Sequence, residues 1–350
     1  MTRETSAIGI SEQPQPARVL ITGGHEVGGL ESFARALLRG FSLLGIPGEV
    51  IPPSAAVSRL RDLRDPRVLK ILSTTAVFSA PLARRAICIA HGIPCAAYQG
   101  WPTFAGNIVS YRLSNFCPGT QLVAVSAYTA LHLNALFGIS IARVILNPVK
   151  EVYLDTFQPE SADRGYVTFV GRLVTAKNLH RLILPVRQLL DENPGLRMAI
   201  IGNGPQKPVL MEMVRGDSRF EFMCNLDDLT VRGFLRRTKI FISGHGAEGL
   251  GITYLEALSQ GCAVAMPASG GGVELGLDHL GSRVHLLPLS FHPSEVLPVL
   301  RRALSAPCIP MSMDAYTPQA VASQYLAVDA QFSLAGRRSP RLTGDWMASA

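Results

Sequence analysis

The chain has 350 residues, of which 47% are hydrophobic, 17% charged and 7% aromatic. This composition supplies apolar surface for about two domains and excludes disorder for most of the chain. Residues 1–15 are polar and lack the apolar core of a signal peptide, and no apolar run free of Gly, Pro or polar breaks reaches 18 residues. We therefore expect a soluble, cytoplasmic protein.

The net charge of +7 would ordinarily suggest nucleic acid as a partner. Residues 1–150 contain 14 Lys and Arg against 7 Asp and Glu, whereas residues 151–350 contain 19 of each. The arginines of the first segment are not interleaved with aromatic residues, and no nucleic-acid-binding motif is present. No nucleic-acid role is therefore expected.

Six cysteines are scattered through apolar segments, without a C-x-x-C pair or paired histidines at the spacing of metal ligands. Cysteines in such positions are typically buried, reduced thiols. The chain also lacks an Asp-x-Asp motif, which would hold a metal together with a diphosphate. We expect no metal and no cofactor.

The first half of the chain alternates short apolar segments with segments of helical period. An apolar segment over 18–22 predicts a strand, followed by a glycine-rich turn and an amphipathic helix over 29–44. Further strands are expected around 76–79, 94–98, 121–125 and 143–146, and further helices over 80–91, 102–116 and 127–137. Such alternation predicts a parallel sheet covered by helices on both faces.

A polar, irregular stretch around 147–165 marks the predicted domain boundary. Beyond it, strands are expected over 166–170, 196–201, 220–224, 239–243 and 262–266, with helices over 178–192, 252–260 and 318–335. We expect an α/β protein of two Rossmann-like domains, 16–150 and 151–335, between polar tails at 1–15 and 336–350. We expect the two parallel sheets to face a central cleft. The terminal helix is expected either to stay with the second domain or to pack back on the first. Ligands bind such sheets at the carboxyl ends of the strands.

Two carboxylates eight positions apart, Glu248 and Glu256, flank the start of a predicted helix. Gly249 and Gly251 lie in the loop before that helix, and their lack of a Cβ lets the backbone approach a ligand closely. The free N–H groups of a helix start favour a phosphate. This pattern suits a sugar nucleotide, because carboxylates accept hydrogen bonds from sugar hydroxyls; the alternative is a loop glutamate and a helix-face glutamate.

Upstream, Arg172 and Lys177 follow a strand and precede a helix, so two cations reach the same sheet edge. Arg172 is suited to binding phosphate oxygens, and Lys177 supplies a point charge. A cation in the first turn opposes the helix dipole, which favours a bound anion over a merely exposed lysine. Together they would neutralise charge on a departing nucleoside diphosphate.

These residues resemble the C-terminal half of the family 4 glycosyltransferases, which have the GT-B architecture. The matching segments are Gly171 to Asn178, Gly202-Asn203-Gly204-Pro205, Glu248 to Gly261 and Gly270 to Glu274. The resemblance implies that Glu248 contacts the donor sugar, Glu256 the ribose, and Arg172 with Lys177 the diphosphate. It also implies that Gly204, Gly249 and Gly251 belong to the donor site, and that transfer retains anomeric configuration and needs no metal.

The resemblance is weaker in the first half. Gly28 and Gly29 resemble the glycine-rich loop of the family, which approaches the donor phosphate or the acceptor, although a plain tight turn is the alternative. His25 in this loop either touches substrate or caps the turn. The family histidine of the acceptor pocket is matched by Gln99, which cannot take a proton at neutral pH, and His91 is assigned a structural role on the helix over 80–91.

Residues 59–85 form a basic segment, which is either a solvated helix face or a surface for anionic lipid headgroups or phosphorylated acceptors. From residue 86 to 142 the only Asp, Glu, Lys or Arg is Arg112. Most of that stretch is expected in the core, and its aromatic residues are also candidates to line a sugar or lipid pocket.

We therefore expect a glycosyltransferase that moves a hexose from a nucleotide-sugar donor to a glycan or lipid-linked acceptor in bacterial surface polysaccharide synthesis, with possible peripheral membrane contact through 59–85. Two alternatives stay open. One is another sugar-nucleotide enzyme of the same fold, such as a hydrolysing epimerase. The other is a non-catalytic binding subunit, which the glutamine at position 99 favours.

Overall fold

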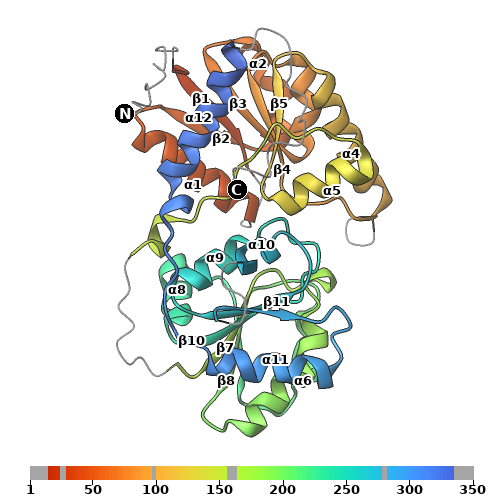
Figure 1. Ribbon diagram of the computed structural model, residues 1–350, viewed down its shortest axis with the longest axis vertical. Helices are drawn as coiled ribbons and strands as arrows, with labels where there is room; N and C mark the ends of the chain where they lie inside the picture. The colour runs from red at the N-terminus through yellow and green to blue at the C-terminus, as the bar shows by residue number, and fades with distance from the viewer. Residues whose placement is uncertain (1–14, 24–28, 97–99, 156–163, 278–281, 335–350) are drawn as a thin grey trace, which may run out of the picture.

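The computed structural model describes residues 15–23, 29–96, 100–155, 164–277 and 282–334. Two lobes lie one above the other, and each is built on a six-stranded parallel sheet (Figure 1). The GT-B architecture expected from the sequence therefore has its two sheets in place, one in each half of the chain.

The first sheet has the strand order β2-β1-β3-β4-β5-β6. Its strands are β1 (Arg18–Thr22), β2 (Gly48–Ile51), β3 (Val68–Ser73), β4 (Ala86–Ala90), β5 (Thr120–Ala124) and β6 (Arg143–Val144). The helices of this half are α1 (Gly29–Leu43), α2 (Leu60–Arg64), α4 (Trp101–Phe116) and α5 (Ala127–Phe137), with short 3-10 segments η1 (Pro53–Ala55), η2 (Val57–Arg59), η3 (Thr74–Leu82) and η4 (Glu151–Tyr153).

Side chains alternate between the two faces of β1, as the period of two in a strand requires. Val19 and Ile21 belong to the apolar cluster that contains Phe33 of α1, whereas Leu20 belongs to the cluster that contains Tyr111 of α4. The first sheet is therefore covered on one face by α1 and on the other by η3, α4 and α5.

The second sheet has the order β12-β11-β10-β7-β8-β9. Its strands are β7 (Tyr166–Val170), β8 (Arg197–Ile201), β9 (Phe220–Met223), β10 (Thr238–Ile242), β11 (Ala263–Pro267) and β12 (Val284–Leu287). The remaining helices are α6 (Leu179–Glu192), α7 (Lys207–Met213), α8 (Asp228–Arg236), α9 (Ile252–Ser259), α10 (Gly272–Leu277), α11 (Pro293–Ser305) and α12 (Pro318–Leu334), with η5 (Thr175–Lys177) and η6 (Asp314–Tyr316).

Both sheets reverse their winding direction beside the first strand of each half. In the first sheet β1 lies between β2 and β3, and in the second β7 lies between β8 and β10. Such reversals leave a crevice at the carboxyl ends of the strands, where ligands bind in open α/β sheets. The loops after β7 and β10 are therefore the first place to look for a site.

Three elements expected in the first half are wrong. The segment around 76–79 is not a strand, and the helix expected over 80–91 is replaced by the end of η3 and by β4. No strand forms over 94–96, and residues 97–98 of the predicted strand lie outside the described residues. The near-continuous apolar run from 76 to 90 fits a buried strand as well as a helix, and periodicity cannot separate the two.

The strands β2, β3, β4 and β12 were not predicted from the sequence, and β3 was missed because Lys70 lies in the middle of it. Lys70 is fully buried, yet its Nζ reaches back to donate to the carbonyl oxygens of Asp65 (2.9 Å) and Val68 (2.8 Å). Burial lowers the pKa of Lys70 to about 8. A lysine that satisfies its ammonium on nearby carbonyls is compatible with a central strand, although a charge in a sequence argues against one.

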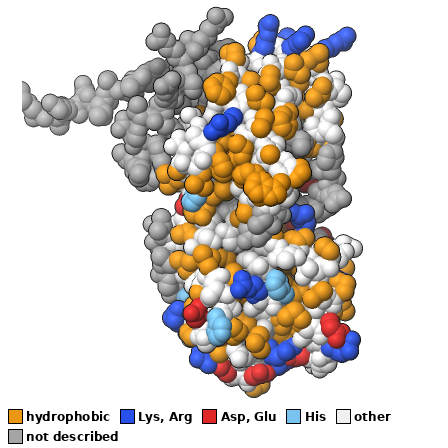
Figure 2. Space-filling view, turned by 90° about the vertical axis from the view of Figure 1, so that its right-hand side faces the viewer, with side chains coloured by type: hydrophobic (Ala, Val, Ile, Leu, Met, Phe, Trp, Pro, Cys, Tyr) orange, Lys and Arg blue, Asp and Glu red, His pale blue; other side chains and the backbone are white. Residues whose placement is uncertain are grey.

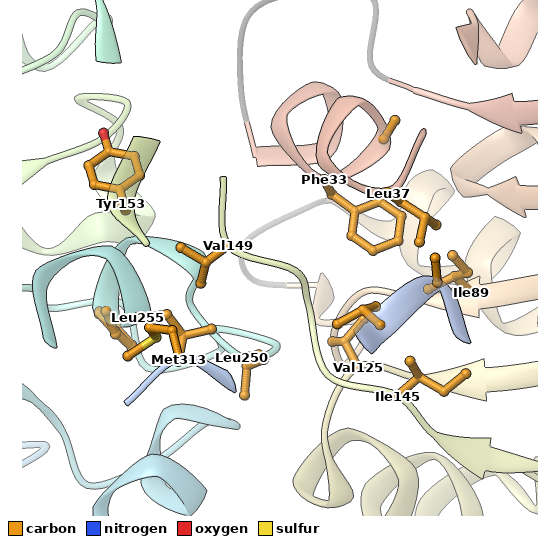
Figure 3. Close-up of a cluster of buried hydrophobic side chains, with 14 of the residues drawn as sticks. Phe33, Leu37, Ile89, Val125, Ile145, Val149, Tyr153, Leu250, Leu255 and Met313 are labelled. Carbon is orange, nitrogen blue, oxygen red and sulfur yellow. The ribbon is translucent and has the colours of Figure 1, made fainter. Parts of the chain in front are cut away.

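The last helix of the chain returns to the first half. α12 packs on α1, where a Cβ on Gly40 would lie 2.0 Å from the carbonyl oxygen of Pro318. Figure 3 shows the large apolar cluster that continues from the first half, with Phe33 and Ile89, into residues of the second, such as Leu255. The two halves are thus joined by packing as well as by chain connections.

Candidate functional site

Charged side chains from two loops meet at the carboxyl edge of the second sheet. The Lys177 Nζ lies 2.6 Å from Oε2 of Glu248, and the same oxygen lies 3.0 Å from Nδ1 of His245. Lys177 comes from the loop after β7, and Glu248 and His245 come from the loop after β10. The structure therefore brings two of the predicted site residues into direct contact, at the point where the sheet reverses.

Glu248 is held in its charged form. Burial raises the pKa of its carboxyl, but the Lys177 ammonium and the His245 side chain together hold it well below the ordinary glutamate range. A carboxylate paired in this way keeps its charge at all working pH values and has a fixed position. Its second oxygen, Oε1, makes no hydrogen bond with the described residues, so it is the acceptor available to a ligand.

Arg172 lies in the same loop as Lys177 and is exposed. Its guanidinium forms no ion pair with any residue that the structure describes. The backbone of this loop is fixed from the other side, because Asn178 adopts a left-handed conformation (φ 49°) and its Nδ2 donates to the carbonyl oxygen of Gly244 (2.8 Å). This hydrogen bond ties the loop that carries Arg172 and Lys177 to the loop that carries Glu248.

Gly204 lies in the neighbouring loop, after β8. It has a positive φ of 151°, and a Cβ there would lie 2.4 Å from the carbonyl oxygen of Leu173. The Leu173 N–H donates to the carbonyl oxygen of Asn203 (2.8 Å). The close approach that Gly204 allows is therefore to the Arg172 loop, and its effect on a ligand would be indirect.

Glu256 is 6% exposed and lies inside α9. Burial raises the pKa of its carboxyl to about 7, with Lys150 opposing the shift and Asp228 adding to it. Its carboxylate has no hydrogen-bond partner among the described residues. Its oxygens are nevertheless not among the described polar atoms that are fully buried without a partner, so they stay accessible, and hydroxyl groups of a bound ligand would be able to donate to them.

The glycines around Glu248 pack against the first half of the chain. A Cβ on Gly249 would lie 1.9 Å from the carbonyl oxygen of His91, and one on Gly271 would lie 2.6 Å from Oγ of Ser126. Gly251 has a φ of 85° and precedes α9, whose start has no side-chain cap. The structure gives Gly249 a role at the junction of the halves, and it leaves the N–H groups at the start of α9 without a capping side chain.

Glu274 is one of the described ionisable side chains that cross between the halves, and Lys150, which pairs with Asp228, is another. The Glu274 carboxylate accepts hydrogen bonds from the backbone N–H groups of Ala127 (3.0 Å) and Tyr128, at the start of α5. Burial raises the pKa of Glu274, and these two N–H groups oppose that shift. A carboxylate at a helix N-terminus is favoured by the helix dipole. A side chain of the second half thus caps a helix of the first.

His91 is the residue that sequence reasoning placed differently. It directly follows β4, at the carboxyl edge of the first sheet, and its ring packs edge-on against Phe33 of α1 (4.8 Å between centroids). Its Nε2 is buried without a hydrogen-bond partner in the described chain, and burial lowers its pKa to about 4. The signal for His91 was the end of β4, which the sequence prediction had placed in a helix.

The other predicted residues of the first half are placed only in part. Gly28, His25 and Gln99 lie outside the described residues. Gly29 begins α1, and a Cβ there would meet no atom within 4 Å, so packing does not require a glycine at this position. Within the ranges that the structure covers, no group of three or more His, Cys, Asp or Glu is arranged to hold a metal ion. All six cysteines are free, but only Cys88 and Cys262 are buried.

The basic segment over 59–85 is mostly neutralised inside the protein. Arg59 pairs with Glu49 and Asp62, Arg67 with Asp65, and Arg85 with Asp329, while Lys70 is buried. Exposed cations that form no ion pair with described residues are Arg61, Arg64 and Arg84. The segment therefore does not form one continuous basic face.

Comparison with known proteins places the site in a recognisable context. Residues 155–280, which include Arg172, Lys177, Glu248 and Glu256, match the family model described as glycosyl transferases group 1. The GDP-mannose-dependent alpha-(1-6)-phosphatidylinositol monomannoside mannosyltransferase of Mycolicibacterium smegmatis is 30% identical over 228 residues. That match covers 57% of this chain and 57% of the mannosyltransferase, so the chain spans little more than half the length of this relative.

Two solved structures match the fold over most of the chain. Sucrose-phosphate synthase from Thermosynechococcus elongatus is 13% identical with a TM-score of 0.65, covering 92% of this chain and 98% of that one. Anabaena Alr3699/HepE, solved with UDP and glucose, is 15% identical with a TM-score of 0.62, covering 91% and 99%. The GT-B fold predicted from the sequence is confirmed.

Proposed function

We propose that this protein is a hexosyltransferase that moves a sugar from a nucleoside-diphosphate donor to a glycan or lipid-linked acceptor. The observation that carries the proposal is the Glu248 carboxylate, held between Lys177 and His245 at the reversal point of the second sheet. A fixed carboxylate with one free oxygen suits hydroxyl groups of a sugar. An unpaired arginine in the adjoining loop suits a diphosphate.

Each donor-site residue has a separate part in this proposal. Arg172 and Lys177 bind the diphosphate and offset the negative charge that develops as the bond from the sugar C1 to the phosphate oxygen breaks. Glu256 accepts hydrogen bonds from the ribose hydroxyls, which its buried carboxyl lacks in the free protein. Glu248 orients the donor sugar.

His91 is a further acceptor-side residue in this proposal, beside Gln99, which lies outside the described residues. It faces the junction from the first sheet, and its lowered pKa keeps the imidazole neutral at pH 7. A neutral imidazole with an unpartnered nitrogen accepts a hydrogen bond from an acceptor hydroxyl. Retention of configuration and independence of metal are also part of the proposal, and the latter rests on the missing Asp-x-Asp motif.

The relatives suggest which donors to test first. The name of the mycobacterial relative specifies GDP-mannose, and the Anabaena neighbour was solved with UDP and glucose. We therefore expect either a GDP or a UDP sugar as donor, and an acceptor for bacterial surface polysaccharide. We also propose that residues 59–85 attract an anionic membrane. Within this segment, Arg61, Arg64 and Arg84 are the residues proposed to do so.

The first experiment is a thermal-shift series with GDP, UDP, ADP, CMP and NAD on the wild type and on Arg172→Ala. A ligand at 100 times its dissociation constant stabilises the folded state by about 2.7 kcal/mol, which is a shift of several degrees. We expect one nucleoside diphosphate to raise the melting temperature of the wild type and to have a much smaller effect on the variant. No shift with any diphosphate would refute the donor site.

The matching nucleotide sugar is then incubated with membrane extract, with and without EDTA, and products are analysed. Transfer that survives EDTA is expected. Release of free sugar or an epimerised product without acceptor would identify a sugar-nucleotide enzyme of another kind. Binding of the nucleotide with no turnover under any condition would identify a binding subunit.

A further inference from the structure

The two most exposed large apolar side chains in the described chain are at opposite ends of one helix. Trp101, at the start of α4, is 72% exposed, and Phe116, at its end, is 82% exposed. Val109 and Leu113 are also exposed between them. Large apolar groups spread along a whole helix face are unusual on a soluble monomer and indicate a surface that binds something.

The residues that α4 buries are few. The fully buried positions of the helix are Ser110, Tyr111 and Ser114. Both serines satisfy their hydroxyls on carbonyls of the same helix, since Oγ of Ser110 donates to Asn107 (2.9 Å) and Oγ of Ser114 donates to Tyr111 (2.8 Å). A helix packed against a sheet in water normally turns its apolar stripe inward. α4 does bury Tyr111 and packs Ile108 against the core, but its other fully buried positions are the two serines, and several of its large apolar side chains point outward.

Neighbouring elements extend the apolar surface. The ring of Phe78 in η3 lies against α4 beside Gly106, and the ring of Phe104 packs on Phe137 at the end of α5 (5.9 Å). We call this surface the α4–α5 face and define it by its exposed members: Phe78, Leu82, Trp101, Val109, Leu113, Phe116, Leu131 and Leu136. Figure 2 shows hydrophobic side chains spread over the upper lobe on this side.

The charge of the face has one sign. Residues 86–142 contain no Asp or Glu, and their only Lys or Arg is Arg112, whose guanidinium donates to the Phe137 carbonyl oxygen at the end of α5 (2.7 and 3.1 Å). Arg84 adjoins the face, because its carbonyl oxygen would lie 3.2 Å from a Cβ on Gly119, just beyond α4. In Figure 2 basic groups line the upper edge, while acidic groups lie mainly on the lower lobe.

From this we infer that the α4–α5 face is a membrane-docking surface that inserts its apolar side chains among the lipids of an anionic bilayer. Tryptophan and phenylalanine anchor proteins at the boundary of headgroups and acyl chains. Arginines at the rim attract anionic headgroups and act at longer range. No helix in the described ranges is long and apolar enough to span a bilayer, so the contact lies on the surface of the membrane.

This inference goes beyond the proposed transfer chemistry, because docking requires neither donor nor acceptor. It also differs from attraction by the basic segment alone. Adsorption through arginines is lost when salt screens the charges, whereas insertion of apolar side chains withstands salt. The orientation of α4 places Trp101 at the end of the helix nearest β4 and His91, so the docked face adjoins the junction of the two halves.

The test uses the full chain with Trp346→Phe, which leaves Trp101 as the single tryptophan. Vesicles of phosphatidylglycerol and phosphatidylcholine, without any glycolipid or nucleotide, are added in low salt and in 0.5 M salt, where the screening length is only about 4 Å. We expect the protein to sediment with vesicles and the Trp101 emission to shift to shorter wavelength, with most of the binding retained in high salt.

Variants separate insertion from other causes. Trp101→Ala with Phe116→Ala should weaken vesicle binding about tenfold or more, whereas the matched control Leu184→Ala, an exposed leucine on α6 of the second half, should leave it unchanged. Arg61→Ala with Arg64→Ala and Arg84→Ala should remove the preference for anionic lipid and leave the salt-resistant part. Thermal melting of each variant checks that it is folded.

Three results would overturn the inference. The first is no emission shift with any vesicle. The second is binding abolished by salt in the wild type and unaffected by Trp101→Ala with Phe116→Ala. The third is a lipid-free protein that is dimeric by light scattering and becomes monomeric in that variant, which would assign the face to a second copy of the chain. A nucleotide thermal-shift series without any shift would not change the emission, vesicle-binding or light-scattering results. The proposed donor site and the proposed docking surface can therefore be refuted separately.

Discussion

The two halves share one architecture and differ in where they place charge. In the second sheet, charged side chains converge on the reversal point, with Lys177 and Glu248 in contact and Arg172 exposed in the same loop as Lys177. In the first sheet, the described strand ends hold Glu31, whose Oε2 would lie 2.6 Å from a Cβ on Gly23 after β1 and which pairs with Arg35, and His91, which burial keeps neutral. The same fold therefore gathers cations suited to a polyanion in the second half, whereas the described strand ends of the first half hold a paired acid and a neutral imidazole.

This difference teaches that sheet topology alone does not define a binding site. Both sheets have a reversal point, but among the described residues the second has Lys177 paired with a buried, fixed carboxylate there, whereas the first has Glu31 paired with the exposed Arg35. The first half instead exposes apolar side chains on α4 and α5, away from its strand ends. We conclude that donor recognition belongs to the second half, and that the first half deals with the acceptor and its surroundings. The following predictions test this division.

The largest effect is expected at the charged pair. Glu248→Ala should lower transfer about 100-fold or more, because a preorganised charged group beside the donor is lost and Lys177 is left without its partner. Lys177→Ala should cost a similar factor, and the double variant should be little worse than either, since the two groups act together. Steady-state rates with saturating donor measure this. Glu221→Ala, which removes an acid paired with Arg197 elsewhere on the same sheet, is the control and should retain full activity.

The next effect tests the first half. His91→Ala should lower transfer about 100-fold while nucleotide affinity stays within about twofold, because His91 lies outside the donor site. Since its pKa is lowered to about 4, the wild-type rate at saturating donor should decline only below about pH 5. The measurement is the pH profile of transfer beside calorimetric titration with nucleotide. Equal loss of affinity and rate would contradict the division between the halves, and His132→Ala on α5 is the matched control.

A smaller effect is expected from Glu256. Its raised pKa of about 7 means that the carboxylate form grows between pH 6 and 8, so donor affinity should rise roughly five- to tenfold over that range. Glu256→Gln should remove the dependence. The folded state holds this proton more tightly than the unfolded chain, so the free protein should lose stability as pH rises from the ordinary glutamate range through 7. Titration with a nucleotide sugar at several pH values checks the first part, and a flat profile in the wild type would contradict it.

The smallest effect concerns the contact between the halves. Glu274→Ala removes the acceptor for two N–H groups of α5, which should cost about 1 kcal/mol, as for loss of a helix cap. We expect the melting temperature to fall by about 2–4 °C and the radius of gyration in solution scattering to increase slightly. Glu295→Ala, an exposed acid at the start of α11, is the matched control. An unchanged melting temperature would show that the Glu274 contact does not hold the halves together.

Five of the six strands of the second half could be predicted from the sequence because they are bounded by glycines and by helices of clear period, whereas β12 and the helices α7, α8, α10 and α11 were not predicted. The strand over 166–170 is found at those residues, and the strand expected over 262–266 is displaced by one. In the first half, β3 was missed because Lys70 looked like part of a basic segment, and β4 was missed because its apolar run has no polar alternation. Both are consequences of full burial, which removes the period-two signal.

The candidate site follows the same division. Glu248 and Lys177 were found because their spacing within loops and helix starts is local information. The contact of Lys177 with Glu248 and the cap that Glu274 provides depend on how loops from different strands meet, and no local pattern encodes that. His245 lies only three residues before Glu248 in the same loop and was overlooked in the sequence. The basic segment misled in part for the same reason, since Asp329, which neutralises Arg85, comes from α12. Glu49 and Asp62, which neutralise Arg59, lie close to it in the chain.

The return of α12 to the first half reverses the order in which the halves are completed. The core begun by Val19 and Ile21 needs Val321 and Tyr325 from α12, which leave the ribosome after the whole second half. At about 5–20 residues per second, the interval between the synthesis of α1 and of α12 is roughly 15–60 s. The apolar face of α1 is uncovered for that time. The half that is translated first is therefore the half that finishes folding last.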